Sequence, residues 1–324
     1  MGLPARASEW ERSRPRRRRR PAPLDRRIVQ WIVRHPRLAL ALIGMFVGWR
    51  LLGAAPGGVA PAAPPRVAGE GERPAATDHA LLPPLSPDAA DRLRDLETAL
   101  RRRTRRPPRS LAWSDPLQER DRLASVRTSV RVAALTFDDG PHPRTTPRVL
   151  DLLARERVCA TFFVVGKQAR KWPGLVRRAV REGHEIGNHT YHHAYLTELS
   201  EADRVTEVEA TEEVLRPLVG KPSRWLRPPG GFHDAALLAD ARRWGMRLAL
   251  WSVDARDWSE PPARVIRDRV LAALKPGCVI LLHDTRRQTL AALPEILVAA
   301  RERGYRFVRL GELESAAGAP PPSP

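Results

Sequence analysis

The chain has 324 residues, more than one typical domain and short for three. Its formal net charge is +19, and residues 1–37 hold 12 Arg against only Glu9, Glu11 and Asp25. The run of Arg at 16–20 is typical of nucleic-acid-binding tails, but an apolar stretch follows it, so we expect a membrane and no nucleic acid as the partner.

Residues 38–49 form the apolar stretch, which Arg50 interrupts. An Arg-rich flank before such a run is the arrangement of a membrane anchor or a signal peptide. The run is shorter than the roughly 20 residues of a transmembrane helix, but 38–55 would span a membrane if Arg50 reached toward the interface. We predict a cytoplasmic tail over 1–37 and an anchor over 38–55, with a cleaved signal or a buried helix as alternatives. Either an anchor or a cleaved signal would export the rest of the chain to the periplasm or the cell surface. The exported part would be membrane-anchored in the first case and secreted in the second.

A stretch rich in Pro, Ala and Arg follows over 56–126 and predicts an extended linker. Within it, Ser86 is placed to cap a short amphipathic helix over 89–103. We expect this helix to be solvated and to lack packing partners.

Short apolar runs then alternate with stretches of helical periodicity. The expected strands are 132–137, 160–166, 184–188, 223–227, 246–253, 278–283 and 305–310, and the expected helices are 146–157, 168–182, 201–219, 235–244, 263–274 and 289–303. This alternation predicts a parallel α/β domain over 127–315, before a disordered tail over 316–324. An open sheet and an incomplete barrel both fit, because the domain is shorter than the roughly 250 residues of an eight-stranded barrel. Cys159 and Cys278 lie in strand-like runs and are expected to be buried thiols rather than a disulfide.

Polar residues stand at the ends of three expected strands, where parallel α/β folds build active sites. Asp138 and Asp139 end the first strand, His189 and His193 follow the third, and His283 ends a later one. Together, paired carboxylates, a histidine pair and a further histidine can provide a metal-binding site, a general base and a general acid. This combination predicts an enzyme, with His283 as general acid.

A metal site can be assembled from these residues. His189 and His193 project to one side if their segment is helical, so both imidazoles would reach one ion, with His192 as the competing choice. Asp139 would complete the ligand set, leaving Asp138 free as general base. The Asp-Asp-Gly-Pro sequence also suits a turn, but a turn does not explain a carboxylate pair at the end of a buried strand.

Five short motifs occur in order along the domain. They are Thr-Phe-Asp-Asp-Gly-Pro at 136–141, His-Thr-x-x-His at 189–193, Arg-Pro-Pro-Gly-Gly at 227–231, Asp-x-x-Asp-Trp at 254–258 and Leu-x-His at 281–283. Over about residues 130–312 the chain resembles the polysaccharide deacetylases, also called the NodB-homology domain or carbohydrate esterase family 4. The resemblance implies a distorted (β/α)7-type barrel that hydrolyses acetyl groups on glycans.

The resemblance also implies roles for the polar residues. Asp139, His189 and His193 would bind a divalent ion, commonly zinc. Asp138 would be the general base and His283 the general acid.

Supporting roles follow from the third and fourth motifs. Arg227 would orient Asp138. Asp257 would set the protonation of His283, and Asp254 is the alternative residue for this role.

Three further residues would contact the substrate. Trp258 and Leu281 would shape a pocket for the acetyl methyl group, and the backbone N–H of Gly230 would help to stabilise the oxyanion. Many members of the family have Tyr where this chain has Gly230. Glycine keeps the N–H and loses the ring, which bears on substrate preference more than on activity.

The expected function is metal-dependent removal of N-acetyl groups from an N-acetylhexosamine polymer. Peptidoglycan is the first choice, because a tethered domain would face the cell wall, and a chitin-like glycan is a close rival. The alternatives are a deformylase or deacylase of a lipid-linked sugar and a glycan-binding protein of the same fold without catalysis.

Overall fold

The computed structural model describes residues 82–102 and 121–317. The chain divides into the units Met1–Glu72 and Arg73–Pro324, and every described residue belongs to the second. The predicted basic tail and the anchor over 38–55 lie outside the described residues. Of the described helices, none has the length and apolar character needed to cross a membrane.

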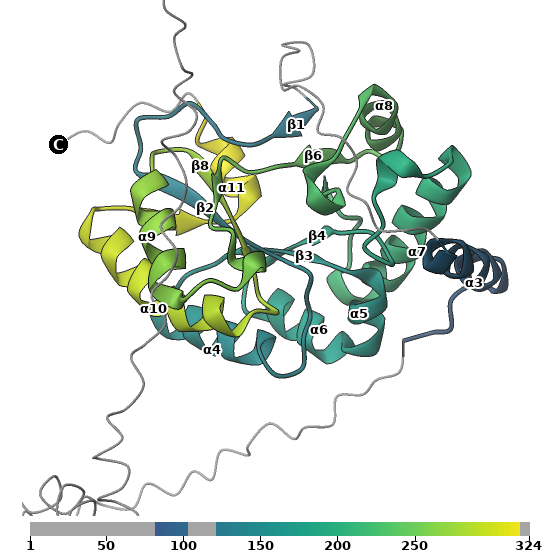
Figure 1. The fold of residues 1–324 in the computed structure, drawn as a ribbon, viewed down its shortest axis with the longest axis horizontal. Helices are drawn as coiled ribbons and strands as arrows, with labels where there is room; N and C mark the ends of the chain where they lie inside the picture. Colours follow the sequence, from purple (N-terminus) through teal and green to yellow (C-terminus); the bar gives the residue numbers. More distant parts are fainter. Residues whose placement is uncertain (1–81, 103–120, 318–324) are drawn as a thin grey trace, which may run out of the picture. The chain divides into compact units, whose positions relative to one another are not determined.

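A parallel sheet forms the centre of the described domain (Figure 1). Its strands are β1 Arg122–Leu123, β2 Val132–Asp138, β3 Thr161–Val164, β4 Glu185–Asn188, β5 Trp225–Leu226, β6 Arg247–Ala249, β7 Val253–Asp254, β8 Cys278–His283 and β9 Arg306–Val308. The strand order is β1-β6-β5-β4-β3-β2-β8-β7, and β9 also pairs with β2. All seven residues of β2 are buried. Ala133, Leu135 and Phe137 pack in one core cluster with residues of the surrounding helices, and Val132 and Ala134 pack in a second cluster with residues of other strands. The predicted parallel α/β class is therefore confirmed.

Helices alternate with these strands and surround them (Figure 1). They are α3 Pro87–Arg102, α4 Thr146–Glu156, α5 Gly166–Lys171, α6 Pro173–Arg181, α7 Glu201–Val219, α8 Ala235–Arg243, α9 Ala263–Ala273, α10 Arg287–Glu302 and α11 Leu310–Ser315, with short 3₁₀ turns at Leu196–Glu198, Pro229–Gly231 and Asp257–Ser259. The single helix expected over 168–182 is two helices. Pro173 begins the second, and a residue before proline disfavours the helical conformation, so the break falls at Trp172.

Helix α3 packs on the domain, so the expectation of a solvated helix without partners was wrong. Leu93 and Leu96 are only 5% and 4% exposed, and the helix lies against α7 (Figure 1). On its polar side, Lys167 Nζ lies 2.7 Å from a carboxylate oxygen of Glu97. The interval predicted as an extended linker therefore contains a packed helix.

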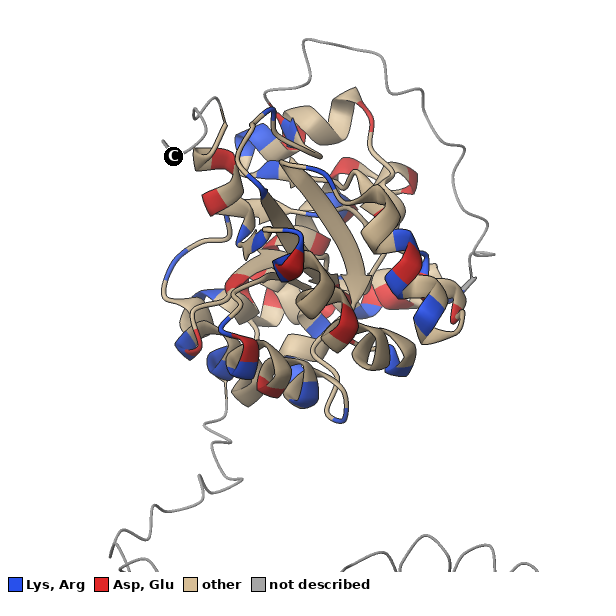
Figure 2. Ribbon diagram, turned by 90° about the vertical axis from the view of Figure 1, so that its left-hand side faces the viewer, with Lys and Arg blue, Asp and Glu red and all other residues tan. Residues whose placement is uncertain are grey.

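The remaining expectations concern thiols and charge. Cys159 and Cys278 are free thiols; Cys278 is buried, which raises the pKa of its thiol, and Cys159 is half-buried. Lys and Arg residues are interspersed with Asp and Glu along the described helices (Figure 2).

Candidate metal centre and active site

The predicted polar residues converge at the carboxyl ends of the strands. Asp138 ends β2 and pairs in register with His283, which ends β8. His189 directly follows β4, and Arg227 directly follows β5. The topology thus gathers at one edge of the sheet residues that lie far apart in the sequence.

Asp139, His189 and His193 form a cluster that fits a divalent metal ion. One ligand atom from each lies within 4.8 Å of the other two. Asp139 Oδ1 is 3.5 Å from His189 Nε2 and 3.2 Å from His193 Nε2. This oxygen is buried and accepts no hydrogen bond within the described part of the chain, so a cation between the three residues would satisfy it. Two imidazoles and a carboxylate are a ligand set that zinc accepts.

The electrostatics of Asp139 agree with a ligand role. Burial alone would raise the pKa of this carboxyl, but the two neighbouring imidazoles of His189 and His193 outweigh burial and hold the pKa well below its usual range. The residue is therefore a carboxylate at any physiological pH. Asp139 also has a φ of 73°, a left-handed conformation that Asp tolerates better than most side chains.

His189 is held in the tautomer that a metal ligand needs. Its Nδ1 lies 2.6 Å from the backbone carbonyl oxygen of Arg227. Because a carbonyl only accepts, Nδ1 carries the proton and donates it, leaving the lone pair of Nε2 directed at the cluster.

The two histidines come together without a helix, which corrects the premise of the prediction. Residues 189–193 form a loop in which Thr190 and His193 have φ values of 63° and 62°. The centroids of the two imidazole rings lie 4.9 Å apart. The competing residue, His192, turns away, with its Nδ1 2.7 Å from Glu207 Oε1.

Glu207 of α7 is a buried residue that the sequence reasoning missed. Its Oε2 accepts hydrogen bonds from the backbone N–H groups of Tyr191 and His192 at 3.0 and 2.8 Å. These contacts hold the loop between the two histidine ligands. A signal was available, since Glu207 shares a helical face with the apolar Val214 and Leu218.

Glu207→Ala is expected to weaken zinc binding about 10-fold to 100-fold, the usual effect of losing an outer contact that orients metal ligands. A competition titration with a zinc chelator measures the affinity. Glu209→Ala is the matched control, because Glu209 is exposed on the same helix. Equal zinc affinities in the two variants would contradict the role given to Glu207.

Asp138 is held by Arg227, as the predicted orienting role requires. Arg227 Nη1 donates to Asp138 Oδ1 at 2.7 Å and to Thr136 Oγ1 at 2.8 Å. The guanidinium is fully buried and lies 4.0 Å from the centre of the Phe163 ring. The other carboxylate oxygen of Asp138 lies 3.8 Å from His189 Nε2, so it faces the metal cluster.

His283 is paired with Asp257, the preferred partner of the two considered. Asp257 Oδ1 lies 2.7 Å from His283 Nδ1, and Oδ2 accepts the His283 backbone N–H at 2.7 Å and the Thr289 hydroxyl at 2.5 Å. Burial lowers the pKa of His283, but Asp257 outweighs burial and raises it to about 9. Asp254 is exposed and accepts the backbone N–H of Arg256, so it does not take this place.

The predicted substrate-contacting residues differ in exposure. Trp258 is 53% exposed beside Asp257, whereas Leu281 is buried in β8. Gly230 has a φ of 65°, and a Cβ there would lie 2.5 Å from the Phe232 ring. Phe232 therefore occupies space beside the backbone of Gly230.

A second missed residue, Asp284, is buried one position after His283. Its Oδ2 accepts a hydrogen bond from the Thr146 hydroxyl, and a Cβ on Gly140 would lie closer than 3.0 Å to its carboxylate. Burial raises the pKa of this carboxyl to about 7. Asp284 thus packs against the turn that follows Asp139.

Comparison with known proteins agrees with this geometry. The family model for polysaccharide deacetylases matches residues 125–249. The chain is 40% identical over 193 residues to a peptidoglycan-N-acetylglucosamine deacetylase of Bacillus cereus, covering 58% of this chain and 90% of that protein. It is 42% identical over 185 residues to a chitooligosaccharide deacetylase of Sinorhizobium fredii, covering 53% and 86%. The crystal structure of the Bc1960 peptidoglycan N-acetylglucosamine deacetylase superposes with a TM-score of 0.60 at 35% identity, covering 62% of this chain and 97% of that one.

Proposed function

The chain belongs to the polysaccharide deacetylase family, and from this premise we propose that it removes N-acetyl groups from a glycan containing N-acetylglucosamine. The relatives named above support peptidoglycan and chitin-like oligomers as substrates. The observation that carries the proposal is the meeting of the Asp139 cluster, the Arg227–Asp138 pair and the Asp257–His283 pair at one edge of the sheet. The similarity to the Bc1960 structure also supports a distorted (β/α)7-type barrel.

The chemistry follows from the positions of these groups. A zinc ion bound by Asp139, His189 and His193 would supply Lewis acidity, which lowers the pKa of water from about 15.7 to about 7. Asp138, fixed by Arg227, removes a proton from the attacking water.

The later steps involve Gly230 and His283. As the water oxygen bonds to the acetyl carbon, the Gly230 N–H donates to the oxyanion. His283, protonated through its contact with Asp257, gives its proton to the sugar nitrogen as the carbon–nitrogen bond breaks. The products are acetate and a free amino sugar.

Asp257→Asn is expected to move the alkaline limb of the pH–rate profile to lower pH. His283 carries the proton for the leaving amine below its folded-state pKa of about 9, and activity falls as the pH rises through that value. Without the carboxylate of Asp257, only Asp138 and Asp139 still oppose the effect of burial on the His283 pKa, so the alkaline limb should lie at lower pH than in the wild type. Profiles of kcat/KM measure the shift, with Asp254→Asn as control. Coincident profiles for wild type and Asp257→Asn would contradict the assignment.

The proposed activity is tested by acetate release from the zinc-loaded, full-length chain. Peptidoglycan and chitooligosaccharides serve as substrates, each with and without a chelator. Chelator-sensitive release from either one supports the proposal and identifies the glycan class. A zinc-bound protein that releases acetate from neither would contradict it.

We further propose that the domain works outside the cytoplasm, tethered through residues 38–55. The support is the Arg-rich flank followed by an apolar stretch. Protease treatment of intact cells, after removal of any outer membrane, should cleave the C-terminal domain. Full protection under conditions that cleave a known exported protein would argue against export.

A further inference from the structure

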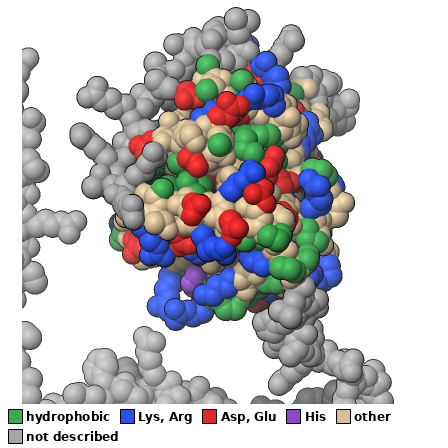
Figure 3. Space-filling model, turned by 90° about the vertical axis from the view of Figure 1, so that its right-hand side faces the viewer, with side chains coloured by type: hydrophobic (Ala, Val, Ile, Leu, Met, Phe, Trp, Pro, Cys, Tyr) green, Lys and Arg blue, Asp and Glu red, His purple; other side chains and the backbone are tan. Residues whose placement is uncertain are grey.

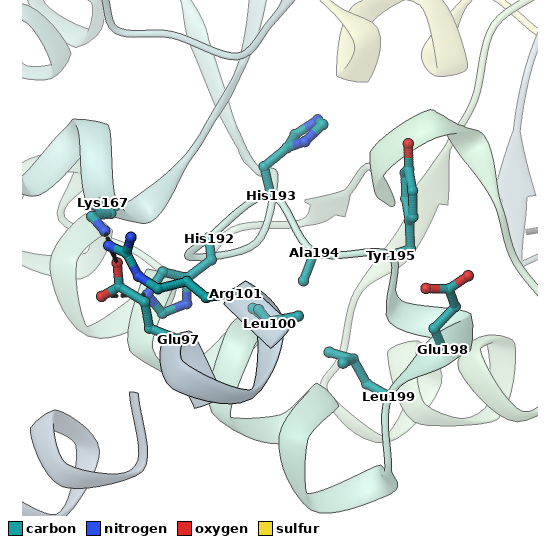
Figure 4. Close-up of a pocket in the computed structure, with 10 residues that line it drawn as sticks. All are labelled: Glu97, Leu100, Arg101, Lys167, His192, His193, Ala194, Tyr195, Glu198 and Leu199. Carbon is teal, nitrogen blue, oxygen red and sulfur yellow. Dashed lines mark hydrogen bonds and ion pairs between the residues drawn. The ribbon is translucent and has the colours of Figure 1, made fainter. Parts of the chain in front are cut away.

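A pocket of about 600 Å³ lies beside the metal cluster and has α3 as one wall (Figure 4). The lining residues are Glu97, Leu100, Arg101, Lys167, His192, His193, Ala194, Tyr195, Glu198 and Leu199. One of them, His193, is a residue of the metal cluster, so an occupant of the pocket would lie next to the reacting group. In Figure 4, His193 and Tyr195 project from the same loop toward the same side, whereas Glu97, Arg101 and Lys167 gather at the other end.

The pocket lies to one side of the reaction centre. Its lining includes His193 but not the proposed acid and base, His283 and Asp138. The sugar that loses its acetyl group must lie close to both proton-transfer groups. The pocket is therefore placed for a different part of the same substrate.

The chemistry of the lining suits a sugar unit. Leu100, Ala194 and Leu199 provide apolar surface, and Tyr195 provides a ring with a polar end. Arg101 and Lys167 add hydrogen-bond donors. A pyranose presents both apolar ring faces and hydroxyl groups, which match this combination. The volume also falls within the roughly 300–1,000 Å³ typical of small-molecule sites.

The charged side chains at one end of the pocket are held in place by ion pairs. Glu97 Oε1 lies 2.7 Å from Lys167 Nζ and 2.9 Å from Arg101 Nη2 (dashed in Figure 4). Glu97 Oε2 lies 3.8 Å from His192 Nε2, and the other ring nitrogen of His192 contacts Glu207. Helix α3 is thus tied through His192 to the loop that carries the metal-binding histidines.

The face of the molecule that carries α3 and α7 is mixed in character. Basic, acidic and hydrophobic side chains are interspersed over most of it, and Lys and Arg side chains gather around a His at its lower edge (Figure 3). Such a face offers both apolar surface and hydrogen-bond donors to a glycan.

We infer that this pocket is a subsite for the N-acetylhexosamine unit next to the one that is deacetylated, with α3 as its wall. The inference rests on the proposed deacetylase function, and it adds helix α3 to the surface that would bind the substrate. Helix α3 precedes residues 125–249, which the family model matches, so the wall comes from outside that range. The N-terminal segment is therefore part of the substrate-binding surface.

The test compares kcat/KM for chitopentaose with kcat/KM for chitobiose, using the full-length chain. Arg101→Ala and Tyr195→Ala are each expected to lower the ratio of the two values about 5-fold to 10-fold, since one charge-assisted hydrogen bond or one ring contact is worth about a tenfold change in binding. Arg92→Ala is the matched control. Arg92 pairs with Asp88 at i,i+4 as Arg101 does with Glu97, but two and a half turns away, on the opposite helix face.

An unchanged ratio in both pocket variants, or an equal fall in Arg92→Ala, would overturn the inference. If no protein releases acetate, calorimetric titration with chitopentaose separates the two claims. Binding that Arg101→Ala weakens while Arg92→Ala does not would support the subsite even though the proposed activity had failed. Absence of binding would overturn the subsite as well.

Discussion

Replacing His189 or Asp139 by Ala should lower acetate release by more than about 10⁴-fold. Each change removes one of the three residues whose ligand atoms lie within 4.8 Å of one another. The ionisation of water near neutral pH, worth roughly 12 kcal/mol from the change in its pKa, depends on a bound ion. General acid or base assistance contributes only about 10²–10⁴-fold. Loss of the metal site is therefore expected to exceed the effect of losing either proton-transfer residue.

The matched comparison is His283→Ala. This variant should retain bound zinc and a measurable trace of activity, because His283 lies outside the metal cluster. Elemental analysis of the purified proteins gives zinc content, and long incubations with chitooligosaccharides give residual acetate release. A fully active His189→Ala enzyme, or one that binds zinc as wild type does, would refute the metal assignment.

Arg227→Met should lower the free energy of unfolding by about 3–5 kcal/mol and remove most activity. Arg227 is fully buried and donates to Asp138, Thr136 and two backbone carbonyls, those of Ala249 and Leu250. Without the guanidinium, the buried carboxylate of Asp138 would lose the positively charged group that is hydrogen-bonded to it. Its orientation toward the metal cluster would also be lost.

A double variant separates the effect on stability from the effect on catalysis. Replacing both members of a buried ion pair is far less costly than removing one, so Arg227→Met combined with Asp138→Asn should recover stability. The same protein should stay inactive, because Asn does not accept the proton of the attacking water. Urea unfolding and acetate release measure the two quantities. A double variant no more stable than Arg227→Met would show that the pair is not the source of the loss.

Much of the architecture follows from local sequence pattern. The apolar run 132–137 is long enough and apolar enough to predict β2, and the capping residue Ser200 and the terminal Gly220 bound α7 at the predicted residues. The position of Asp138 at the end of a buried strand is visible in the same way. Each of these features depends on residues within a few positions of one another, so periodicity and capping are sufficient to find them.

Other features depend on contacts between distant residues. The i,i+4 spacing of His189 and His193 suggested a helix, but the loop is shaped by Glu207, whose carboxylate bonds to the intervening backbone. The apolar face that Glu207 shares with Val214 and Leu218 indicates that this residue is buried, but the backbone groups that its carboxylate binds are known only from the tertiary structure. The place of Asp284 is likewise set by distant residues, because its carboxylate packs against Gly140 and accepts the Thr146 hydroxyl.

Helix α3 combines a feature that follows from local sequence with one that depends on distant contacts. Its amphipathic pattern and its Ser86 cap predicted that a helix would form, but not that Leu93 and Leu96 would find a surface on α7 to pack against. Local propensity determines whether a segment becomes a helix or a strand. The topology decides which buried charges are paired, which loops are held in place and which helix forms the wall of the pocket. Each of those interactions needs a partner from elsewhere in the chain.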